Sequence, residues 1–145
     1  MANYTALCPG TTPTEAQLQD MSRRPVAFVL AEPATAVTTG DSKLGIVIPP
    51  ELNGYNLVRV LASVATVSSS GTPTYQIRNA TQAVDMLTTK ITIDANEPTS
   101  LTAATPPVID TANDDVASGD LIYIDKDVAG TGEKGDIVIC VFQLP

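Results

Sequence analysis

Short aliphatic runs recur along most of the chain, separated by segments rich in Gly, Pro, Thr and Ser. The runs are residues 26–31, 44–49, 56–67, 74–79, 90–94, 108–110, 120–125 and 136–143. Residues 83–87 (AVDML) fit either a strand or a helical turn. The runs are rich in Val, Ile and Thr and do not alternate with helical segments, as the strands of a parallel sheet would. The pattern therefore predicts an all-β fold of about seven or eight short antiparallel strands, arranged as a sandwich or a barrel.

The order of apolar and polar positions also predicts how particular strands are placed. Residues 56–67 alternate, and the shared face holds Val58, Val60, Ala62 and Val64. Residues 68–73 (SSSGTP) are typical of a turn. We therefore expect residues 74–79 to return as the hairpin partner of residues 56–67.

Two runs are apolar at nearly every position, VAFVLA at 26–31 and IVICVF at 137–142. A strand of an antiparallel sandwich normally keeps one polar face toward water. We therefore expect part of the outer surface to be covered, either by another subunit or by the N-terminal arm of the same chain.

The beginning of the chain predicts a short helix ahead of the strands. Thr12 is placed to cap it, with Pro13 in the first helical position and Glu15 completing a capping box. Pro25 ends the helix, because helical geometry is disfavoured for a residue that precedes proline. So short a helix is not stable alone in water and needs a surface to lie on, on this domain or on a partner.

Length and composition fit one domain: 145 residues, 43% hydrophobic and 17% charged, divided into an arm (1–24) and a β-sandwich domain (25–145). The formal net charge is −8, and all of it comes from residues 94–145, where ten acids accompany Lys126 and Lys134. These acids fall mostly between apolar runs, so we expect them in solvent-facing loops. An acidic chain repels phosphate backbones, which argues against a nucleic-acid partner. The absence of His excludes His-based catalysis and His metal ligands.

Neither the cysteines nor the N-terminal residues indicate export or a membrane. Cys8 and Cys140 are too few for a disulfide framework, and Cys140 lies in an apolar run where a buried, unreactive thiol is expected. The N-terminal residues lack the basic start and apolar core of a secretory signal, and no apolar stretch is long enough to cross a membrane. We expect synthesis in a cytoplasm and no membrane partner.

Two motif matches overlap in one loop, and neither predicts a cofactor. Residues 130–135 (GTGEKG) match GxGxxG, but a strand follows where a dinucleotide site needs a helix, so we interpret them as a hairpin loop. Residues 125–136 partly follow a calcium-binding loop, but Ala129 has no ligand oxygen and Asp136 stands where a Glu is needed. We expect no cofactor and no metal site.

Asp110 is the strongest candidate for a catalytic residue. Its surroundings, Val108-Ile109-Asp110-Thr111-Ala112, are similar to the apolar-apolar-Asp-Thr-Gly/Ala context of retroviral-type aspartic proteases. Those enzymes pair two such carboxylates. They also need a later apolar-apolar-Gly segment, which is missing after Ala112. We therefore interpret Asp110 as part of an Asx-type turn at the end of a strand.

Three stretches of the chain carry a family resemblance: residues 52–60 (LNGYNLVRV), 68–94 (SSSGTPTYQIRNATQAVDMLTTKITID) and 109–142 (IDTANDDVASGDLIYIDKDVAGTGEKGDIVICVF). They resemble small structural proteins of tailed-bacteriophage virions, namely the jelly-roll domains of capsid decoration (cement) proteins and of head or tail fibres. Residues 119–142 in particular look like the last hairpin of such a domain. The resemblance implies a jelly-roll-like sandwich without catalysis.

The resemblance to decoration proteins also implies partners and a location. Such a protein is made in the host cytoplasm, assembles with itself as a trimer, and stabilises the head by binding the major capsid protein on the outer surface of the virion. Its arm would make the contacts, and the candidate residues are Tyr4, Leu7, Leu18, Met21, Arg23 and Arg24. Tyr4 and Leu7 would supply apolar anchors, and Arg23 and Arg24 would pair with carboxylates of the shell.

Two alternatives stay open at this point. The first is a fibre or receptor-binding module directed at carbohydrate. The absence of Trp and the presence of only four Tyr weigh against it, since carbohydrate sites favour exposed aromatic rings. The second and more remote alternative is a retroviral-type aspartic protease that uses Asp110.

Overall fold

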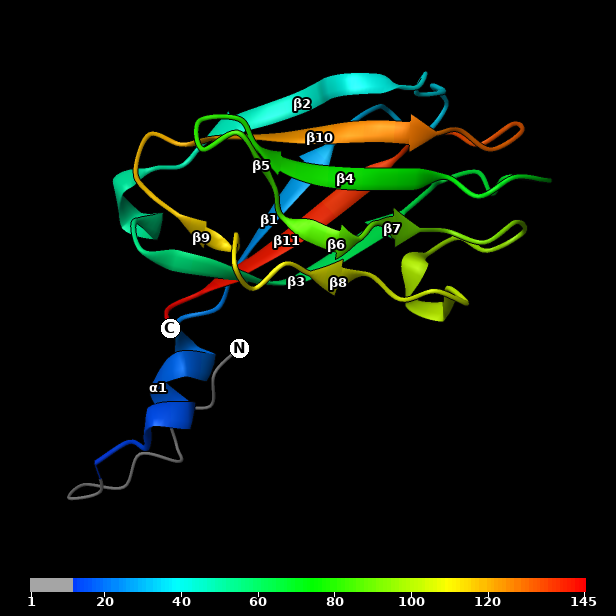
Figure 1. Ribbon diagram of the computed structural model, residues 1–145. Helices are drawn as coiled ribbons and strands as arrows, with labels where there is room; N and C mark the ends of the chain where they lie inside the picture. Colours follow the sequence, from blue (N-terminus) through cyan, green and yellow to red (C-terminus); the bar gives the residue numbers. More distant parts are fainter. Residues whose placement is uncertain (1–11) are drawn as a thin grey trace.

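The computed structural model describes residues 12–145 and shows two packed antiparallel sheets with a short helix at one end (Figure 1). Sheet A contains, in spatial order, β1 (Arg24–Val29), β11 (Ile137–Gln143), β3 (Tyr55–Ser63) and β9 (Asp115–Val116). Sheet B contains β2 (Gly40–Val47), β10 (Leu121–Val128), β4 (Thr74–Asn79) and β5 (Val84–Asp85), with β7 (Ile91–Thr92) also paired to β4. A small two-stranded sheet contains β6 (Leu87–Thr89) and β8 (Val108–Ile109). The predicted all-β antiparallel sandwich is confirmed.

The connectivity of the strands is that of a jelly roll. Strand β1 pairs with β11, β2 with β10, β3 with β9 and β4 with β5, so the chain forms a long antiparallel ribbon that turns back between β4 and β5. The ribbon wraps so that β11 also pairs with β3, and β10 with β4. This second set of pairings produces the two layers, as in other double-sheet jelly rolls.

Alternate side chains of the two sheets fill the space between the layers. In β11, Val138, Cys140 and Phe142 are completely buried, and Ile122 and Ile124 of β10 lie in the same core. These positions follow the two-residue period of a strand. With no Trp in the chain, the core is mostly aliphatic.

Strand β3 departs from the predicted alternation at its centre. Val58 is the extra residue of a β-bulge, because the register passes from the pair Leu57–Phe142 to the pair Arg59–Val141. Val58 is therefore 41% exposed, whereas Leu57 is buried. The prediction that Val58 shares a face with Val60, Ala62 and Val64 was wrong, because a bulge shifts one residue out of the alternation.

Two predicted hairpins were also wrong. Strands β3 and β4 lie in different sheets, because residues 64–73 carry the chain across the sandwich. Strands β10 and β11 likewise lie in different sheets, so residues 129–136 connect the layers. The second connection does have turn chemistry, with positive φ at Gly132 and Gly135. A turn signal reverses the chain but does not specify which sheet the next strand joins.

The arm contains α1 (Glu15–Met21), which lies outside the sandwich, beside the C-terminus (Figure 1). Its cap is Thr14 rather than the expected Thr12. The Thr14 hydroxyl accepts from the Gln17 N–H at 3.3 Å, and the Gln17 side chain accepts from the Thr14 N–H at 2.9 Å. The sequence offers a capping box in both registers, and the later one leaves Pro13 outside the helix. No residue of α1 is buried.

The segment after α1 attaches the arm to the end of β11. Ser22 Oγ accepts a hydrogen bond from the Leu144 N–H at 3.0 Å, and Arg23 Nε donates to Gln143 Oε1 at 3.1 Å. Strand β1 then begins at Arg24, close to the expected junction of arm and domain. The arm is therefore held at one corner of sheet A.

Candidate functional site

The outer face of sheet A is lined by apolar side chains from three neighbouring strands. We call this set the sheet A face, and it comprises Pro25, Ala27, Val29, Val58, Leu61, Ile137, Ile139 and Val141. Ile139 lies at its centre, with Ala27 of β1 on one side and Leu61 of β3 on the other. All eight side chains are exposed or half-buried, and Val29 is 55% exposed.

The described part of the arm does not cover this face. Residues of α1 are all at least partly exposed, and the segment that follows the helix contacts the end of β11 rather than the middle of the sheet. The sequence left two expectations for what covers the doubly apolar strands, the N-terminal arm or another subunit. For residues 12–23 of the arm, the first expectation was wrong. Cover by another subunit stays a prediction, and residues 1–11 lie outside the described residues.

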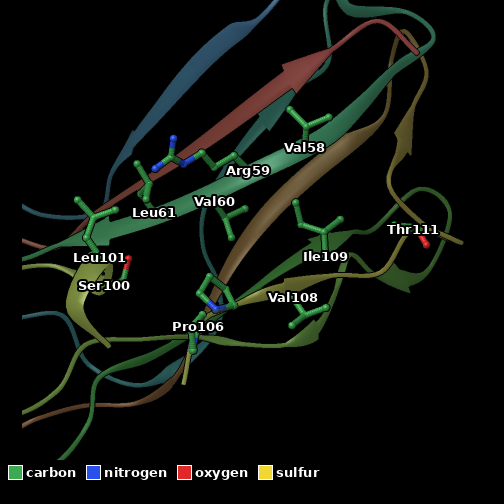
Figure 2. A pocket seen from close by; sticks show the side chains of 11 residues that line it. Val58, Arg59, Val60, Leu61, Ser100, Leu101, Pro106, Val108, Ile109 and Thr111 are labelled. Atoms are coloured by element: carbon green, nitrogen blue, oxygen red, sulfur yellow. The ribbon is translucent and has the colours of Figure 1, made fainter. Parts of the chain in front are cut away.

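A groove of about 500 Å³ borders the sheet A face along β3. Figure 2 shows β3 on one side of it and the segment carrying Pro106 and Val108 on the other, with Leu101 at one end and Thr111 at the other end. Leu101 and Val108 are 63% and 50% exposed. The groove therefore extends the apolar surface beyond the strands.

A smaller hollow of about 370 Å³ is lined by Arg23, Pro25, Val58, Arg59 and Val141. It shares Val58 and Arg59 with the groove, so apolar surface continues from the base of the arm to the far side of β3. Arg59 is exposed, and within residues 12–145 it forms no ion pair. A guanidinium in such a place is suited to a carboxylate supplied by a partner.

The predicted apolar contacts of the arm are only partly described. Leu18 is 53% exposed on α1, and Met21 is half-buried at its last turn. Tyr4 and Leu7 lie outside the described residues.

The two predicted arginine contacts lie at the junction of the arm and sheet A. Arg23 Nη1 lies 3.3 Å from Asp20 Oδ1, and the Arg23 side chain also lines the smaller hollow. Arg24 donates to the main-chain carbonyl groups of Met21 and Arg23. Both side chains are exposed and lie beside the sheet A face, since Arg24 begins β1 and Arg23 lines the smaller hollow, whereas Leu18 lines neither the hollow nor the groove.

Asp110 holds a turn together with both of its carboxylate oxygens. Oδ1 accepts from the Ala112 N–H at 3.1 Å, and Oδ2 accepts from the Asn113 side-chain amide at 2.7 Å. The predicted Asx-type turn is therefore confirmed.

The carboxylates of the calcium-like stretch are occupied by cations of the same chain. Asp125 accepts from Arg78 Nε at 3.0 Å, and Asp127 lies 3.0 Å from Lys90 Nζ. Within the described part of the chain, no group of three or more metal-ligating side chains is gathered.

Several acids that were expected in solvent-facing loops are buried instead, with exposures of 5% or less: Asp120, Asp125, Glu133 and Asp136. The expectation was wrong for them because the fold supplies each carboxylate with donors or a cation. Asp120 accepts from Asn79 and Gln82 at 2.8 Å each and from the Ala117 N–H at 3.0 Å. Burial raises the pKa of Asp120, but the three donors outweigh it and hold that pKa below its usual value.

A lysine and two carboxylates are buried in the interior near the connection between β10 and β11. Lys126 is 0% exposed, its Nζ lies 2.5 Å from Glu133 Oε1, and it contacts Asp136 Oδ2. Tyr75 pairs with Lys126 across β4 and β10, and its hydroxyl donates to Asp136 Oδ2 at 2.8 Å. We call Tyr75, Lys126, Glu133 and Asp136 the Lys126 cluster.

Gly130 allows Glu133 to enter this cluster. The Gly130 N–H donates to Glu133 Oε2 at 2.5 Å. A Cβ at this position would lie 2.4 Å from the same oxygen and 2.4 Å from Ser68 Cβ. The first glycine of the GxGxxG match thus has a local physical reason, which is the close packing of Gly130 on a buried carboxylate.

Sequence reasoning missed the Lys126 cluster, although the alternation held a signal for it. Lys126 stands two residues after buried Ile124, and Asp136 two residues before buried Val138. The two-residue period therefore points both side chains into the core.

Cys140 has the environment that the sequence predicted. It is completely buried, and burial raises the pKa of its thiol to about 12. A thiol with so high a pKa is almost entirely protonated at neutral pH and is a poor nucleophile. Cys8 lies outside the described residues.

Comparison with known proteins assigns no family: no family model, known protein or solved structure matches the chain. Within residues 12–145, no helix combines the length and apolar character needed to cross a membrane. The function is therefore argued from the residues themselves.

Proposed function

We propose that the protein is a structural component of a tailed-phage virion, a decoration protein that binds the outer surface of the head as a trimer. Its partners are the major capsid protein and copies of itself. The observation that carries the proposal is the sheet A face, an apolar surface that the described part of the chain leaves uncovered. A protein whose work is to hold neighbouring subunits together needs such a surface and needs no catalytic group.

The energetics of the sheet A face support a role in association. Monomeric proteins rarely expose contiguous apolar patches of more than a few hundred Å² without a binding role. Val29, Val58, Leu101 and Val108 are each at least 41% exposed on this face or along its groove. Complete burial of one such aliphatic side chain contributes roughly 1.5–3 kcal/mol. Contact with another subunit would therefore be favourable over several strands at once.

The arm supports a second contact, with the shell. Helix α1 has seven residues and no buried side chain, so it is too short to be stable without a surface. Leu18 would be buried on the major capsid protein, and Arg23 and Arg24 would pair with its carboxylates. A trimer would attach through several arms at once, which strengthens the overall binding without any new kind of contact.

The aromatic residues do not favour the carbohydrate-binding alternative. Tyr55 and Tyr75 are buried, as are both Phe residues, Phe28 and Phe142. Tyr123 is half-buried, with the Arg78 guanidinium 5.7 Å from the centre of its ring. Residues 12–145 thus present no open aromatic platform on which a sugar would stack.

Oligomeric state and head binding test the proposal. Size exclusion with light scattering should give three times the 15.1 kDa chain mass, and a monomer at all accessible concentrations would overturn the trimer. The protein should also co-sediment with undecorated heads assembled from the major capsid protein of the same phage. Deletion of residues 1–21 should abolish co-sedimentation while leaving the trimer intact. The deletion stops there because Ser22 and Arg23 hold the end of β11.

The protease alternative has a direct test of its own. We expect no peptidase activity at acid pH from the intact protein, because the Asp110 carboxylate is engaged in its turn. Activity that disappears in Asp110→Asn would contradict the structural role.

A further inference from the structure

The Lys126 cluster has a composition that ion pairing alone does not explain. One ammonium group faces two carboxylates, and all three residues are 2% exposed or less. Within residues 12–145, Asp136 Oδ1 is buried without a hydrogen-bond partner, and the contact of Glu133 Oε1 is with Lys126 Nζ at 2.5 Å. Buried carboxylates with unpartnered oxygens are costly, so the cluster points to chemistry beyond a resting salt bridge.

We propose that Lys126 and Asp136 condense to form an intramolecular amide (isopeptide) bond, with Glu133 as the catalytic residue. The proposal is independent of what the sheet A face binds. It concerns a covalent modification that the chain carries out on itself.

The reaction balances without any oxidant, reductant or co-reactant. A proton passes from the Lys126 ammonium to the Asp136 carboxylate, which gives an amine and a carboxylic acid. Nζ attacks Cγ, so a nitrogen–carbon bond forms. Glu133 accepts a second proton from Nζ and delivers it to the departing hydroxyl group, so the carbon–oxygen bond breaks and one water leaves. Glu133 returns to its starting state.

Each neighbour in the cluster is placed for one part of this reaction. Glu133 Oε1 lies 2.5 Å from Nζ, within reach of the proton that must leave it. The Tyr75 hydroxyl donates to Asp136 Oδ2 at 2.8 Å and would stabilise negative charge on that oxygen during attack. Burial, followed by the charge of Asp136, raises the pKa of Tyr75 far above its usual range, so the phenol stays a donor.

The geometry selects Asp136, rather than Glu133, as the residue that is joined. Glu133 is restrained through Oε2 by the Gly130 N–H. Asp136 contacts Nζ directly, through the oxygen to which the Tyr75 hydroxyl also donates, so Nζ lies beside the carboxyl group that it would attack.

Burial supplies the driving force. In water, amide formation from an amine and an acid is unfavourable, but groups held in reacting geometry have effective concentrations of roughly 10⁵–10⁸ M. The reaction also removes one positive and one negative charge from a dry interior, where isolated charges are costly. The bond would join β10 of sheet B to the residue that precedes β11 of sheet A.

The intact mass of the purified full-length chain, measured after denaturation, tests the proposal. The wild type should be lighter than its sequence by the mass of one water. Fragmentation should locate a branch between Lys126 and Asp136. A folded wild type at the full sequence mass would overturn the proposal, and so would a water loss located at any other residue.

Two variants test the roles assigned to Glu133 and Asp136 in this loss of water. Glu133→Gln keeps the shape of the side chain but does not accept the proton, so this protein should keep its full mass. Asp136→Asn should lose ammonia instead of water, because an amide nitrogen then leaves. Water loss in Glu133→Gln would show that Glu133 is not the catalytic residue.

The Lys90–Asp127 pair is a matched control. Its nitrogen and oxygen lie 3.0 Å apart, but its side chains are 44% and 32% exposed. Solvated charges have no drive to condense, so Lys90→Met should show the same water loss as the wild type. A branch at Lys90 would contradict the role assigned to burial.

Discussion

The Lys126 cluster and the sheet A face depart in opposite directions from the ordinary distribution of side chains. In the first, charged groups at no more than 2% exposure lie inside the sandwich. In the second, aliphatic side chains of β1, β3 and β11 face outward, and Val29 is 55% exposed. The buried charges meet opposite charges and a phenol from the same chain. The exposed face meets no such complement from residues 12–145, so its complement is expected in another molecule.

The two regions differ in where the groups that stabilise them come from. A buried charge must be neutralised where it lies by groups of the same chain, either close in sequence, as for Lys126 with Glu133 and Asp136, or distant, as for Asp125 with Arg78. An apolar surface is stabilised by any matching surface, so its partner need not belong to the chain. Four experiments, from the largest expected effect to the smallest, test this contrast.

Removing the lysine should give the largest effect. Lys126→Met leaves Glu133 and Asp136 buried without the group that neutralises them, as an ammonium or through the proposed amide, and should lower the free energy of unfolding by about 3–5 kcal/mol or more. Urea unfolding measures the loss. The matched change at the surface, Lys90→Met, removes an exposed partner of Asp127 and should cost less than about 1 kcal/mol. Equal losses in the two variants would show that burial does not distinguish the two pairs.

A charge placed on the sheet A face should weaken association without unfolding the protein. Val29→Lys puts an ammonium group into the expected interface and should weaken self-association at least about tenfold. Light scattering over a range of concentrations measures the shift toward monomer. The control is Val47→Lys at the end of β2 in sheet B, because Val47 is 59% exposed and Val29 is 55% exposed. If both variants behave alike, the sheet A face is not the interface.

Asp120 tests a buried charge that is stabilised by hydrogen bonds alone. Its pKa is lowered in the folded state, so its contribution to stability is present above the ordinary Asp value of about 4 and is lost as the pH falls through the lowered pKa. The contribution should be on the order of 1 kcal/mol. The free energies of unfolding of the wild type and of Asp120→Asn should therefore differ most near neutral pH and become equal in acid. A difference that does not change with pH would contradict this account.

Deletion of the arm should have the smallest effect on stability. Residues 15–21 bury no side chain, so removing residues 12–21 should change the free energy of unfolding by less than about 0.5 kcal/mol. Thermal unfolding of the two proteins at equal concentration measures this difference. A much larger loss would mean that the arm covers part of the domain.

The sequence predicted the inward-facing residues better than it predicted strand partners. The alternation of residues 56–67 correctly places Val60, Ala62 and Val64 on one buried face, because that pattern depends on one strand alone. The pairing of β3 with β11 and of β10 with β4 joins segments far apart in the chain, and no local signal encodes it. Nearby turn residues therefore suggested hairpins that the fold does not form.

For the candidate sites, too, the sequence predicted local features but not the contacts that form only in the folded chain. The doubly apolar strands indicated that an outer face needs cover, and the sheet A face is where those strands lie. The two acids of the Lys126 cluster, Glu133 and Asp136, were expected to face solvent, because acids between apolar runs usually do. Only the three-dimensional meeting of Lys126 with Glu133 and Asp136 makes their burial stable. The bulge at Val58 was likewise invisible, because it depends on the register of two strands.

The position of β1 at the edge of sheet A has a mechanical consequence. This strand is hydrogen-bonded to β11 alone, through six residue pairs from Arg24–Phe142 to Val29–Ile137. The arm joins the domain at the first of these pairs. Tension on the arm would therefore load a single ladder, beginning at Arg24 and advancing one pair at a time. Under a pulling force β1 would detach first, and strands β2, β10 and β4 would keep their pairing until later.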